Sequence, residues 1–453
     1  MAGLCRSRHL STPEEGYSVA NAFVRAVRTP DLRAKLAFTI GLLAIYRLGV
    51  YLPTPGFNYT NVAFCADQAT HASGQSLLGM VSMFSGGALL QLSVFSLGVM
   101  PYITASIIIQ LLRVVIPRFE ALHKEGQSGT AKLTQYTRYL TIGLAILQST
   151  TIITLVRSGN FFVGCNLPLV PDQSVPMLLL MILTMTVGTI LIMWMGELIT
   201  ERGVGNGMSL LIFTSIAASF PVALTQIWKL KGWITFSLVI LVAMLVMIGV
   251  IFVEQSQRRI PVQYAKRMVG RRMYGGASTY IPIKVNQSGV IPVIFASSLL
   301  AVPQLISSFG KQTDGWVQWV HDNLVQGQHF SWIYTTVYVL LIVFFAFFYT
   351  SITFNAEEIA DNMARYGGFI PGVRAGKPTE RYLQYVINRI QTPGALYLAI
   401  IALIPMLAMV FLGTAQDFPL GGASILIVIG VGLDTVKQID AKLQQHHYEG
   451  ILR

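Results

Sequence analysis

About ten long apolar stretches divide this chain, and almost no charged residue lies in the middle of any of them. A helix needs about 20 apolar residues to cross a hydrocarbon core of roughly 30 Å. Because every backbone donor and acceptor in lipid must be paired within its own segment, these stretches are predicted to be membrane-spanning helices. They cover residues 33–52, 94–116, 133–157, 175–196, 207–228, 233–254, 285–308, 332–354, 384–413 and 420–438.

The charged residues gather in the connecting segments and make up only 11% of the 453 residues, whereas a soluble domain has about 25%. The formal net charge of +12 would suggest nucleic-acid binding in a soluble protein. Here, alternate connections carry most of the 32 Lys and Arg residues. By the positive-inside rule both termini are expected in the cytoplasm, as an even number of spans requires. The exceptions are Arg157, Lys229, Lys231 and Lys311 in predicted external loops and Arg47 in the first span.

The chain has three cysteines, and their spacing does not match a metal site. Cys65 and Cys165 both fall on the predicted external side, so a disulfide between them is possible. Two free thiols are nevertheless expected, because multi-span membrane proteins do not depend on disulfides as small secreted domains do. No cofactor is predicted.

The spans divide evenly between the two halves of the chain. Residues 1–17 are expected to be disordered, and residues 18–30 favour an amphipathic helix on the cytoplasmic face over a plain tail. Five spans then fall in 31–228 and five in 229–440, before a cytoplasmic tail at 441–453. An odd number of spans per half gives the halves opposite topology, an arrangement common in transport proteins.

An apolar, glycine-rich segment at about 77–89 lies between the first two spans and is too short to cross a membrane. Irregular backbone at membrane depth is tolerated only inside protein or along a cavity. The segment is therefore predicted to be a re-entrant element that folds back into the bundle, with a simple surface loop as the alternative.

Two long cytoplasmic loops, 255–284 and 355–383, are basic and contain Gly and Pro at positions typical of hairpin-like tips. Basic loops beside a membrane often bind anionic lipid. Two such loops on the same side also suggest docking of a large acidic partner.

The distribution of ionisable residues argues against two other classes. An ion-coupled transporter usually has ionisable groups near the midplane, but Arg47, Glu197, Glu254 and Asp434 all lie near span ends. An intramembrane metalloprotease would need a His-Glu-x-x-His helix, and all seven histidines fall in tails or loops. No catalytic activity is predicted, and a secondary transporter with inverted repeats remains the alternative function.

Eight motifs in this chain, in the same order, resemble those of the SecY/Sec61-alpha family of protein translocase subunits. The resemblance runs from about residue 18 to the end of the chain. The motifs are MFSGGAL (83–89), LGVMPYITASIIIQLL (97–112), KEGQSGTAKLTQYTRY (124–139), ERGVGNGMSLLIF (201–213), YAKRMVGRRMYGG (264–276), IPIKVNQSGVIPVIFASS (281–298), EEIADNM (357–363) and FIPGVRAGK (369–377).

The resemblance implies an all-α integral membrane protein in the plasma membrane of a bacterium. Ten transmembrane helices would form two inverted five-helix halves around a central hourglass pore with a re-entrant plug helix. Such a protein-conducting channel passes unfolded secretory polypeptides across the membrane and releases transmembrane segments into lipid through a lateral gate. The implied partners are the SecE and SecG subunits, the SecA ATPase, the ribosome, signal sequences, nascent or unfolded polypeptides and membrane lipids.

The resemblance also assigns residues to four sites. Two departures from the family pattern are Val99 in a ring that is otherwise isoleucine, and Ala375 where a proline usually follows the docking arginine. For the lateral gate residues, ordinary helix packing is an equally good explanation. The sites are a pore ring (Val99, Ile103, Ile212, Ile216, Ile294, Ile427), a plug (Met83, Phe84, Ser85, Gly86, Gly87, Leu89), a lateral gate (Thr104, Gln148, Ser298) and a docking surface for SecA or the ribosome (Arg271, Arg272, Arg374).

Overall fold

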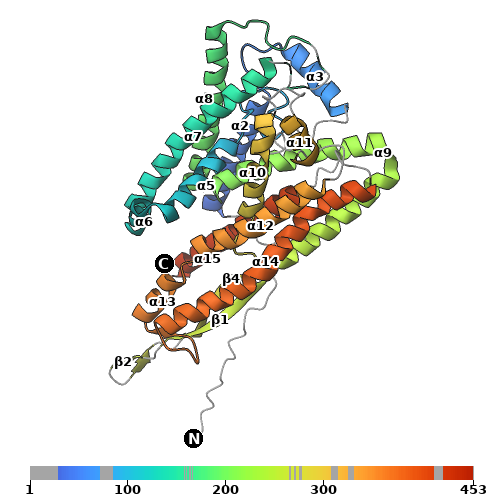
Figure 1. The fold of residues 1–453 in the computed structure, drawn as a ribbon. Coiled ribbons are helices and arrows are strands. Elements are labelled where there is room, and N and C mark those ends of the chain that lie inside the picture. The colour runs from blue at the N-terminus through green and yellow to red at the C-terminus, as the bar shows by residue number, and fades with distance from the viewer. Residues whose placement is uncertain are drawn as a thin grey trace.

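The chain is mostly helical in the computed structural model (Figure 1). The structure describes residues 29–71, 85–157, 159, 161–162, 165, 167–264, 267–269, 272–274, 278–307, 315–324, 331–412 and 422–451. The helices are α2 (Pro30–Val50), α3 (Tyr59–His71), α5 (Met100–Val115), α6 (Pro117–Lys124), α7 (Gln127–Arg157), α8 (Val175–Arg202), α9 (Gly207–Gln255), α10 (Ile291–Ser307), α11 (Gly315–Leu324), α12 (Trp332–Thr353), α13 (Ala356–Arg365), α14 (Lys377–Leu412) and α15 (Gly422–Ile451).

Each of the ten predicted apolar stretches contains a helix or part of one. By length and composition, five of the helices in the described part of the chain could cross a membrane. A sixth is added if α5 and α6, which meet at a bend of 97°, are counted as one span. Two shorter apolar stretches are also helical, Gly207–Pro221 in the first part of α9 and Ile291–Leu300 in α10. The fold is therefore that of a helical multi-span membrane protein.

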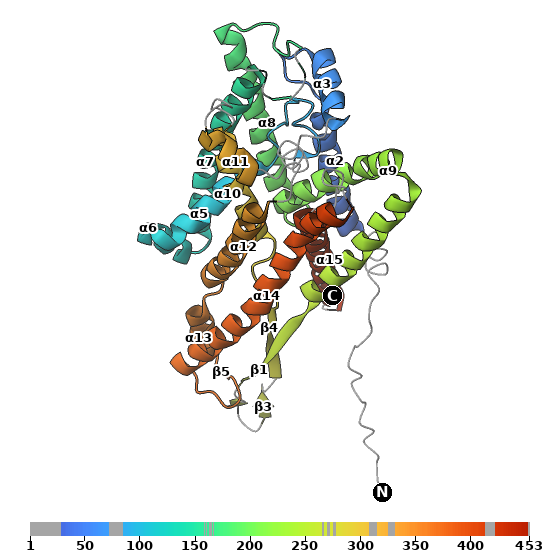
Figure 2. The same cartoon turned by 45° about the vertical axis from the view of Figure 1, so that its right-hand side comes forward.

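The longest helix, α9, contains two of the predicted spans and reverses direction between them. Gly232 has φ 81° and ψ 179°, values that no helical residue adopts. Glycine adopts positive φ readily because it has no Cβ. The bend divides α9 where the sequence predicts the boundary between the two halves, and Figures 1 and 2 show its two arms folding back on each other.

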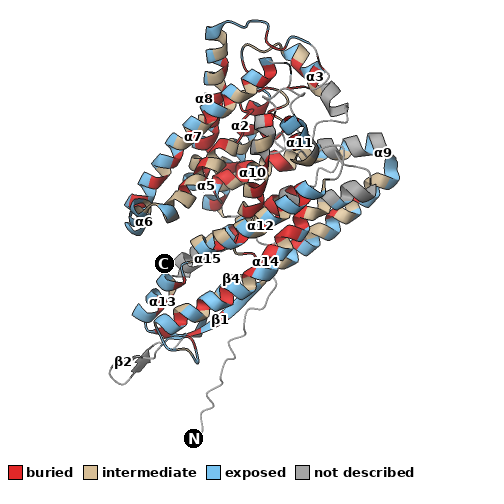
Figure 3. Cartoon of the chain, viewed as in Figure 1, coloured by how far each residue is buried: buried red, intermediate tan, exposed pale blue. Residues whose placement is uncertain are grey.

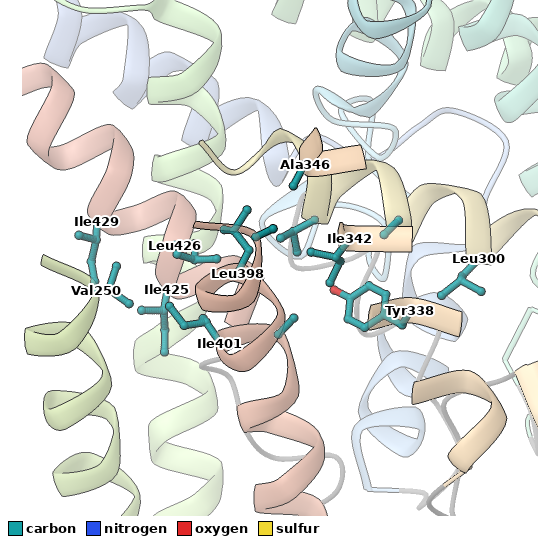
Figure 4. Close-up of a cluster of buried hydrophobic side chains, with 14 of the residues drawn as sticks. Val250, Leu300, Tyr338, Ile342, Ala346, Leu398, Ile401, Ile425, Leu426 and Ile429 are labelled. Atoms are coloured by element: carbon teal, nitrogen blue, oxygen red, sulfur yellow. The ribbon is translucent and has the colours of Figure 1, made fainter. Parts of the chain in front are cut away.

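The three largest hydrophobic clusters of the described residues hold most of the helices together. An N-terminal core includes Leu89, Leu92, Met181 and Met185. A C-terminal core is built from α9, α10, α12, α14 and α15, whose side chains meet in Figure 4. A central cluster contains residues from both halves.

The outer faces of the helices are exposed, as the pale blue stretches of α7, α9 and α14 in Figure 3 show. Many of the exposed side chains are apolar; Ile234 and Phe252 on α9 are 82% and 75% exposed. Large exposed apolar surfaces are unfavourable in water and mark an interaction or membrane surface. These faces are suited to contact with lipid tails.

The two basic loops are folded into one unit, which the sequence did not predict. Its strands are β1 (Gln257–Tyr264), β2 (Arg267–Val269), β3 (Arg272–Tyr274), β4 (Ser278–Lys284) and β5 (Gly368–Phe369). β1 pairs antiparallel with β4 from its own loop and with β5 from the other loop. A small core that includes Ile260, Val262, Ile283 and Leu383 lies beneath this sheet and α13. The hairpin-like tips are therefore present, but the two loops form one unit.

Cys65 and Cys165 form a disulfide, so the expectation of two free thiols is wrong. The two residues are 100 positions apart in the chain. The expectation rested on what multi-span proteins need in general, and only the fold brings α3 beside the segment that follows α7. Both sulfurs lie in the N-terminal core.

We expect Cys65 and Cys165 to resist maleimide when native membranes are denatured in SDS without reductant, and to react after reduction. Cys5 serves as the internal control, since it should react in both conditions. Cys165→Ser is expected to lower stability by about 2–4 kcal/mol, the usual contribution of a native disulfide, as measured by thermal unfolding in detergent. Labelling of all three cysteines before reduction would contradict the pairing.

Several expectations about the ends of the chain lie outside the described residues. These are the disordered segment 1–17 and all but the last two residues of the amphipathic helix 18–30. At the other end, α15 continues to Ile451. The segment 441–453, expected to be a tail, is therefore largely a helical extension of the last span.

Candidate functional site

The six pore-ring positions meet in the central cluster, although they come from four separate segments of the chain. Val99 is the residue before α5, and Ile103 ends the first turn of this helix. Ile212 and Ile216 lie four residues apart on α9. Residues four apart in a helix lie on one face. Five of the six side chains are buried, and Ile103 is partly buried against them. The four segments contribute Val99 and Ile103, Ile212 and Ile216, Ile294, and Ile427.

The start of α9 is fixed by a cap. The Asn206 side chain accepts hydrogen bonds from the backbone amides of Met208 and Ser209 at 3.2 and 3.5 Å. An asparagine in this position pairs amide groups that the first helical turn leaves without partners. The cap defines where α9 begins and hence which of its faces carries Ile212 and Ile216.

A cavity of about 600 Å³ lies on one side of the central cluster. Four ring residues, Ile103, Ile212, Ile294 and Ile427, form part of its lining, whereas Val99 and Ile216 do not. The rest of the wall is mixed: it includes the polar residues Gln110, Asn206, Ser209, Glu254, Lys284, Asn286 and Asp434 and apolar residues such as Met208, Val290 and Ile291. The cavity therefore has a mixed wall and is apolar where it meets the ring.

Two polar pairs in this wall were not predicted. The Asn286 amide donates to the Glu254 carboxylate at 2.6 Å and to the Gly289 carbonyl at 3.2 Å. The Lys284 ammonium lies 3.4 Å from the Asp434 carboxylate. These pairs join the connection into α10 to the last turn of α9 and to the middle of α15. Glu254 and Asp434 stood out in the sequence only as charges near span ends.

The end of the predicted plug, from Ser85 to Leu89, and the turns after it pack against the central cluster and the N-terminal core. Ala88 packs in the central cluster, and Leu89 and Leu92 pack in the N-terminal core. The Leu89 amide donates to the Ser85 hydroxyl at 3.1 Å. Residues 86–92 form a series of turns. Met83 and Phe84, with the rest of the predicted plug before residue 85, lie outside the described residues.

Three residues that the sequence did not assign to any site lie beside this segment, and one of them bonds to it. The Arg47 guanidinium donates to the Gly86 carbonyl at 3.1 Å. The Tyr46 and Ser215 hydroxyls share a buried hydrogen bond of 2.6 Å. The sequence feature that could have pointed to these residues was the charge of Arg47 within the first predicted span.

The three lateral-gate residues are half-buried on α5, α7 and α10. Thr104 donates to the Met100 carbonyl of its own helix at 3.0 Å. Within the described residues, no hydrogen bond joins the Thr104, Gln148 and Ser298 side chains to one another. Their role in a gate remains a prediction.

Two of the three docking arginines, Arg272 and Arg374, lie on the folded unit of strands. Arg374 is exposed in the turn between β5 and α14, and its carbonyl accepts a hydrogen bond of 2.8 Å from Thr379. This bond and the positive φ of Gly372 and Gly376 give the turn its shape without the usual proline at Ala375. Arg272 begins β3, and Arg271 lies outside the described residues.

Comparisons of the sequence and of the structure with known proteins agree on one family. A family model described as SecY matches residues 93–436. The protein translocase subunit SecY of Streptomyces coelicolor is 62% identical over 439 residues, which cover 95% of this chain and 99% of that one. The corresponding subunit of Mycobacterium tuberculosis is 54% identical over 444 residues, covering 96% and 100%.

Three solved structures share the fold at 18–19% identity and cover 89% of this chain and 91% of their own. One is a protein-conducting channel, with a TM-score of 0.62. Another is a SecY structure described for a plug domain that stabilises the closed state of the channel, with a TM-score of 0.59. The third is Sec61 in the canine ribosome–channel complex, with a TM-score of 0.58. The family model and the sequence identity together show that this chain belongs to the SecY family of multi-pass membrane protein translocase subunits.

Proposed function

We propose that this chain is the central protein-conducting subunit of a bacterial Sec translocon. It passes unfolded secretory polypeptides across the plasma membrane and releases transmembrane segments into lipid. The observation that carries the proposal is the position of the six ring residues in one apolar cluster, which borders a cavity and also contains Ala88 at the end of the plug. The relatives at 54–62% identity are protein translocase subunits.

An apolar ring suits a polypeptide of any sequence. Side chains of isoleucine size close a narrow opening by contact, and apolar constrictions also exclude water and ions. Such a ring does not bind the side chains that pass it, whereas a polar ring would retain some of them. Val99 is smaller than isoleucine by one methylene, so the seal depends more on the other five positions.

The spans, the plug and the lateral gate are assigned to this chain as parts of the same channel. Ten spans form two inverted halves around an hourglass pore, and the bend at Gly232 joins the halves. The plug at about 77–89 closes the pore from outside, and Ser85, Gly86, Gly87 and Leu89 form its end. Thr104, Gln148 and Ser298 line a lateral gate. A hydrogen bond between membrane helices is worth roughly 0.6 kcal/mol, and none joins these three side chains in the described structure, so a signal sequence can open the gate.

The orientation places both termini in the cytoplasm. The basic loops then face the cytoplasm, as the positive-inside rule requires. The disulfide between Cys65 and Cys165 supports the same orientation, since disulfides persist in oxidising compartments such as the outside of a bacterial cell. In Figures 1 and 2, α13 and the strands lie toward one end of the molecule, and α3 and the bend of α9 toward the other.

The cytoplasmic unit of strands is the docking surface for SecA and the ribosome, with SecE and SecG as further subunits. Arg271, Arg272 and Arg374 suit both kinds of partner, because a guanidinium group bridges phosphates or carboxylates with two parallel hydrogen bonds. The Sec61 structure in complex with a ribosome supports a ribosome as one partner of this fold.

The test is reconstitution of the chain in vesicles with SecE, SecG and SecA. We expect an unfolded secretory protein to become protected from protease only when ATP is present. A secondary transporter would instead accumulate a small solute along an ion gradient without these partners. Protease protection that does not depend on this chain would contradict the proposed function.

A further inference from the structure

Arg47 is a charged residue within a predicted membrane span. It lies in the last turn of α2, within the first predicted span, and is partly buried. Among the described residues no carboxylate forms an ion pair with it. Its guanidinium group lies 5.9 Å from the centre of the Tyr51 ring and donates a hydrogen bond to the Gly86 carbonyl. A charge inside a membrane span is costly and usually serves a function.

Gly86 fits closely between Arg47 and α9. Its φ is +66°, and a Cβ at this position would lie 2.8 Å from an Arg47 guanidinium nitrogen and 3.2 Å from the Ser215 Cα. Both the backbone conformation and the space therefore require glycine. The Gly86 peptide is thus held between the guanidinium group on one side and the α9 backbone next to Ile216 on the other.

The position of α2 at Arg47 is fixed by the preceding residue, Tyr46. Tyr46 is fully buried and shares its hydroxyl hydrogen bond with Ser215, which ties α2 to α9. The Tyr46 ring also stacks on Phe95, with ring centres 5.9 Å apart. Gly49, one turn further along α2, lies against the same Phe95 ring, since a Cβ there would be 2.0 Å from it. The Arg47 side chain therefore extends from a fixed base.

The segment that Arg47 holds has unfavourable features of its own. Leu92 has φ 46° and is the non-glycine residue with positive φ in the described part of the chain. Such a conformation is strained for a side chain of this kind. The buried side-chain oxygens of Gln91, Ser93 and Ser96 have no hydrogen-bond partner in the described structure. These costs lower the stability of the turns that continue from Gly86, so the position of the segment depends on the contacts that hold it.

We propose that Arg47 is a positioning residue that keeps the end of the plug, from Ser85 to Leu89, against the ring in the closed channel. It acts through the Gly86 carbonyl, and loss of this bond allows the segment to leave Ser215 and Ile216. The inference rests on the proposed channel function. It adds a residue outside the plug and the ring that sets the balance between the closed and open states.

The experiment compares Arg47→Gln with Arg47→Lys in the complete complex in planar bilayers. We expect Arg47→Gln to raise the resting ion conductance about tenfold. The glutamine side chain is neutral and two atoms shorter, so its amide does not reach the Gly86 carbonyl. Arg47→Lys keeps the charge and a donor of longer reach, so it should raise the conductance less than threefold. Gly86→Ala, which crowds both Arg47 and Ser215, should match Arg47→Gln and gives an independent result if that variant fails to assemble. A general structural defect would not be rescued by lysine.

A second readout reports on the segment itself. In a chain with Cys5→Ser, Ser85→Cys should react with an impermeant maleimide, added on the side of Cys65 and Cys165, about tenfold faster when Arg47→Gln is present. Unchanged labelling and conductance would overturn the inference. Ile427→Asn, measured in parallel, separates the two proposals. If it leaks and Arg47→Gln does not, only the role of Arg47 fails, and if neither leaks, the assignment of the pore fails.

Discussion

Ile427→Asn is expected to raise the ion conductance of the resting channel about tenfold in planar bilayers. Ile427 is 3% exposed, packs in the central cluster and borders the cavity. An amide buried without a partner costs about 1–3 kcal/mol. The closed state bears this cost and a hydrated open state does not. A difference of 1.4 kcal/mol changes an equilibrium tenfold, and water drawn to the amide further weakens an apolar seal.

The matched control is Ile425→Asn, two residues earlier on the same helix. Ile425 is equally buried, but it packs in the C-terminal core and not in the central cluster. We expect this variant to be less stable to heat while its resting conductance stays at the wild-type level. Equal leakage in the two variants would mean that the seal is not located at the ring. Ile103→Asn should behave as Ile427→Asn, since Ile103 also borders the cavity.

Arg374→Glu is expected to reduce SecA-driven translocation about tenfold while the protein still inserts normally into the membrane. Arg374 is exposed in its turn, and no ion pair within the described structure involves it. Reversal of its charge places a carboxylate against the acidic groups that an arginine would contact, and like charges across an interface cost several kcal/mol. The measurement is the ATP-dependent protection of an unfolded secretory protein from protease.

Arg365→Glu provides the control for a general effect of charge on this surface. Arg365 is exposed at the end of α13, on the same folded unit but outside the turn. We expect its reversal to reduce translocation less than twofold. If Arg374→Glu translocates at the wild-type rate, Arg374 does not take part in docking. If both variants lose activity equally, binding depends on the overall charge of the unit.

The apolar pattern predicted the helices well because lipid leaves the backbone few alternatives. The gap between the spans at 207–228 and 233–254 coincides with the bend at Gly232 in α9. The family resemblance, carried by motifs such as those at 97–112 and 201–213, is confirmed by the family model and by the relatives. The spacing of Ile212 and Ile216 indicated a shared helical face, but their position beside Ile294 and Ile427 depends on how four segments pack.

Contacts between distant segments could not be predicted from local pattern. The disulfide joins residues 100 positions apart, and the strand β5 adds to a sheet that begins more than 90 residues earlier. Each depends on tertiary contacts that leave no periodic signal. The role inferred for Arg47 could not be predicted either, because it also depends on a tertiary contact. A charge near the end of a span commonly reaches toward the membrane surface, and only the structure places Gly86 beside it.

The most direct test of the central claim is site-specific crosslinking from Ile103, Ile216 and Ile294 to a secretory polypeptide stalled during translocation in native membranes. The three positions lie on α5, α9 and α10 and meet in the central cluster. Leu241, an exposed residue on the outer face of α9, serves as the control position. The proposed channel predicts crosslinks at all three ring positions and none at Leu241. A stalled chain that engages the membrane but crosslinks to none of the three would contradict a polypeptide path through the ring.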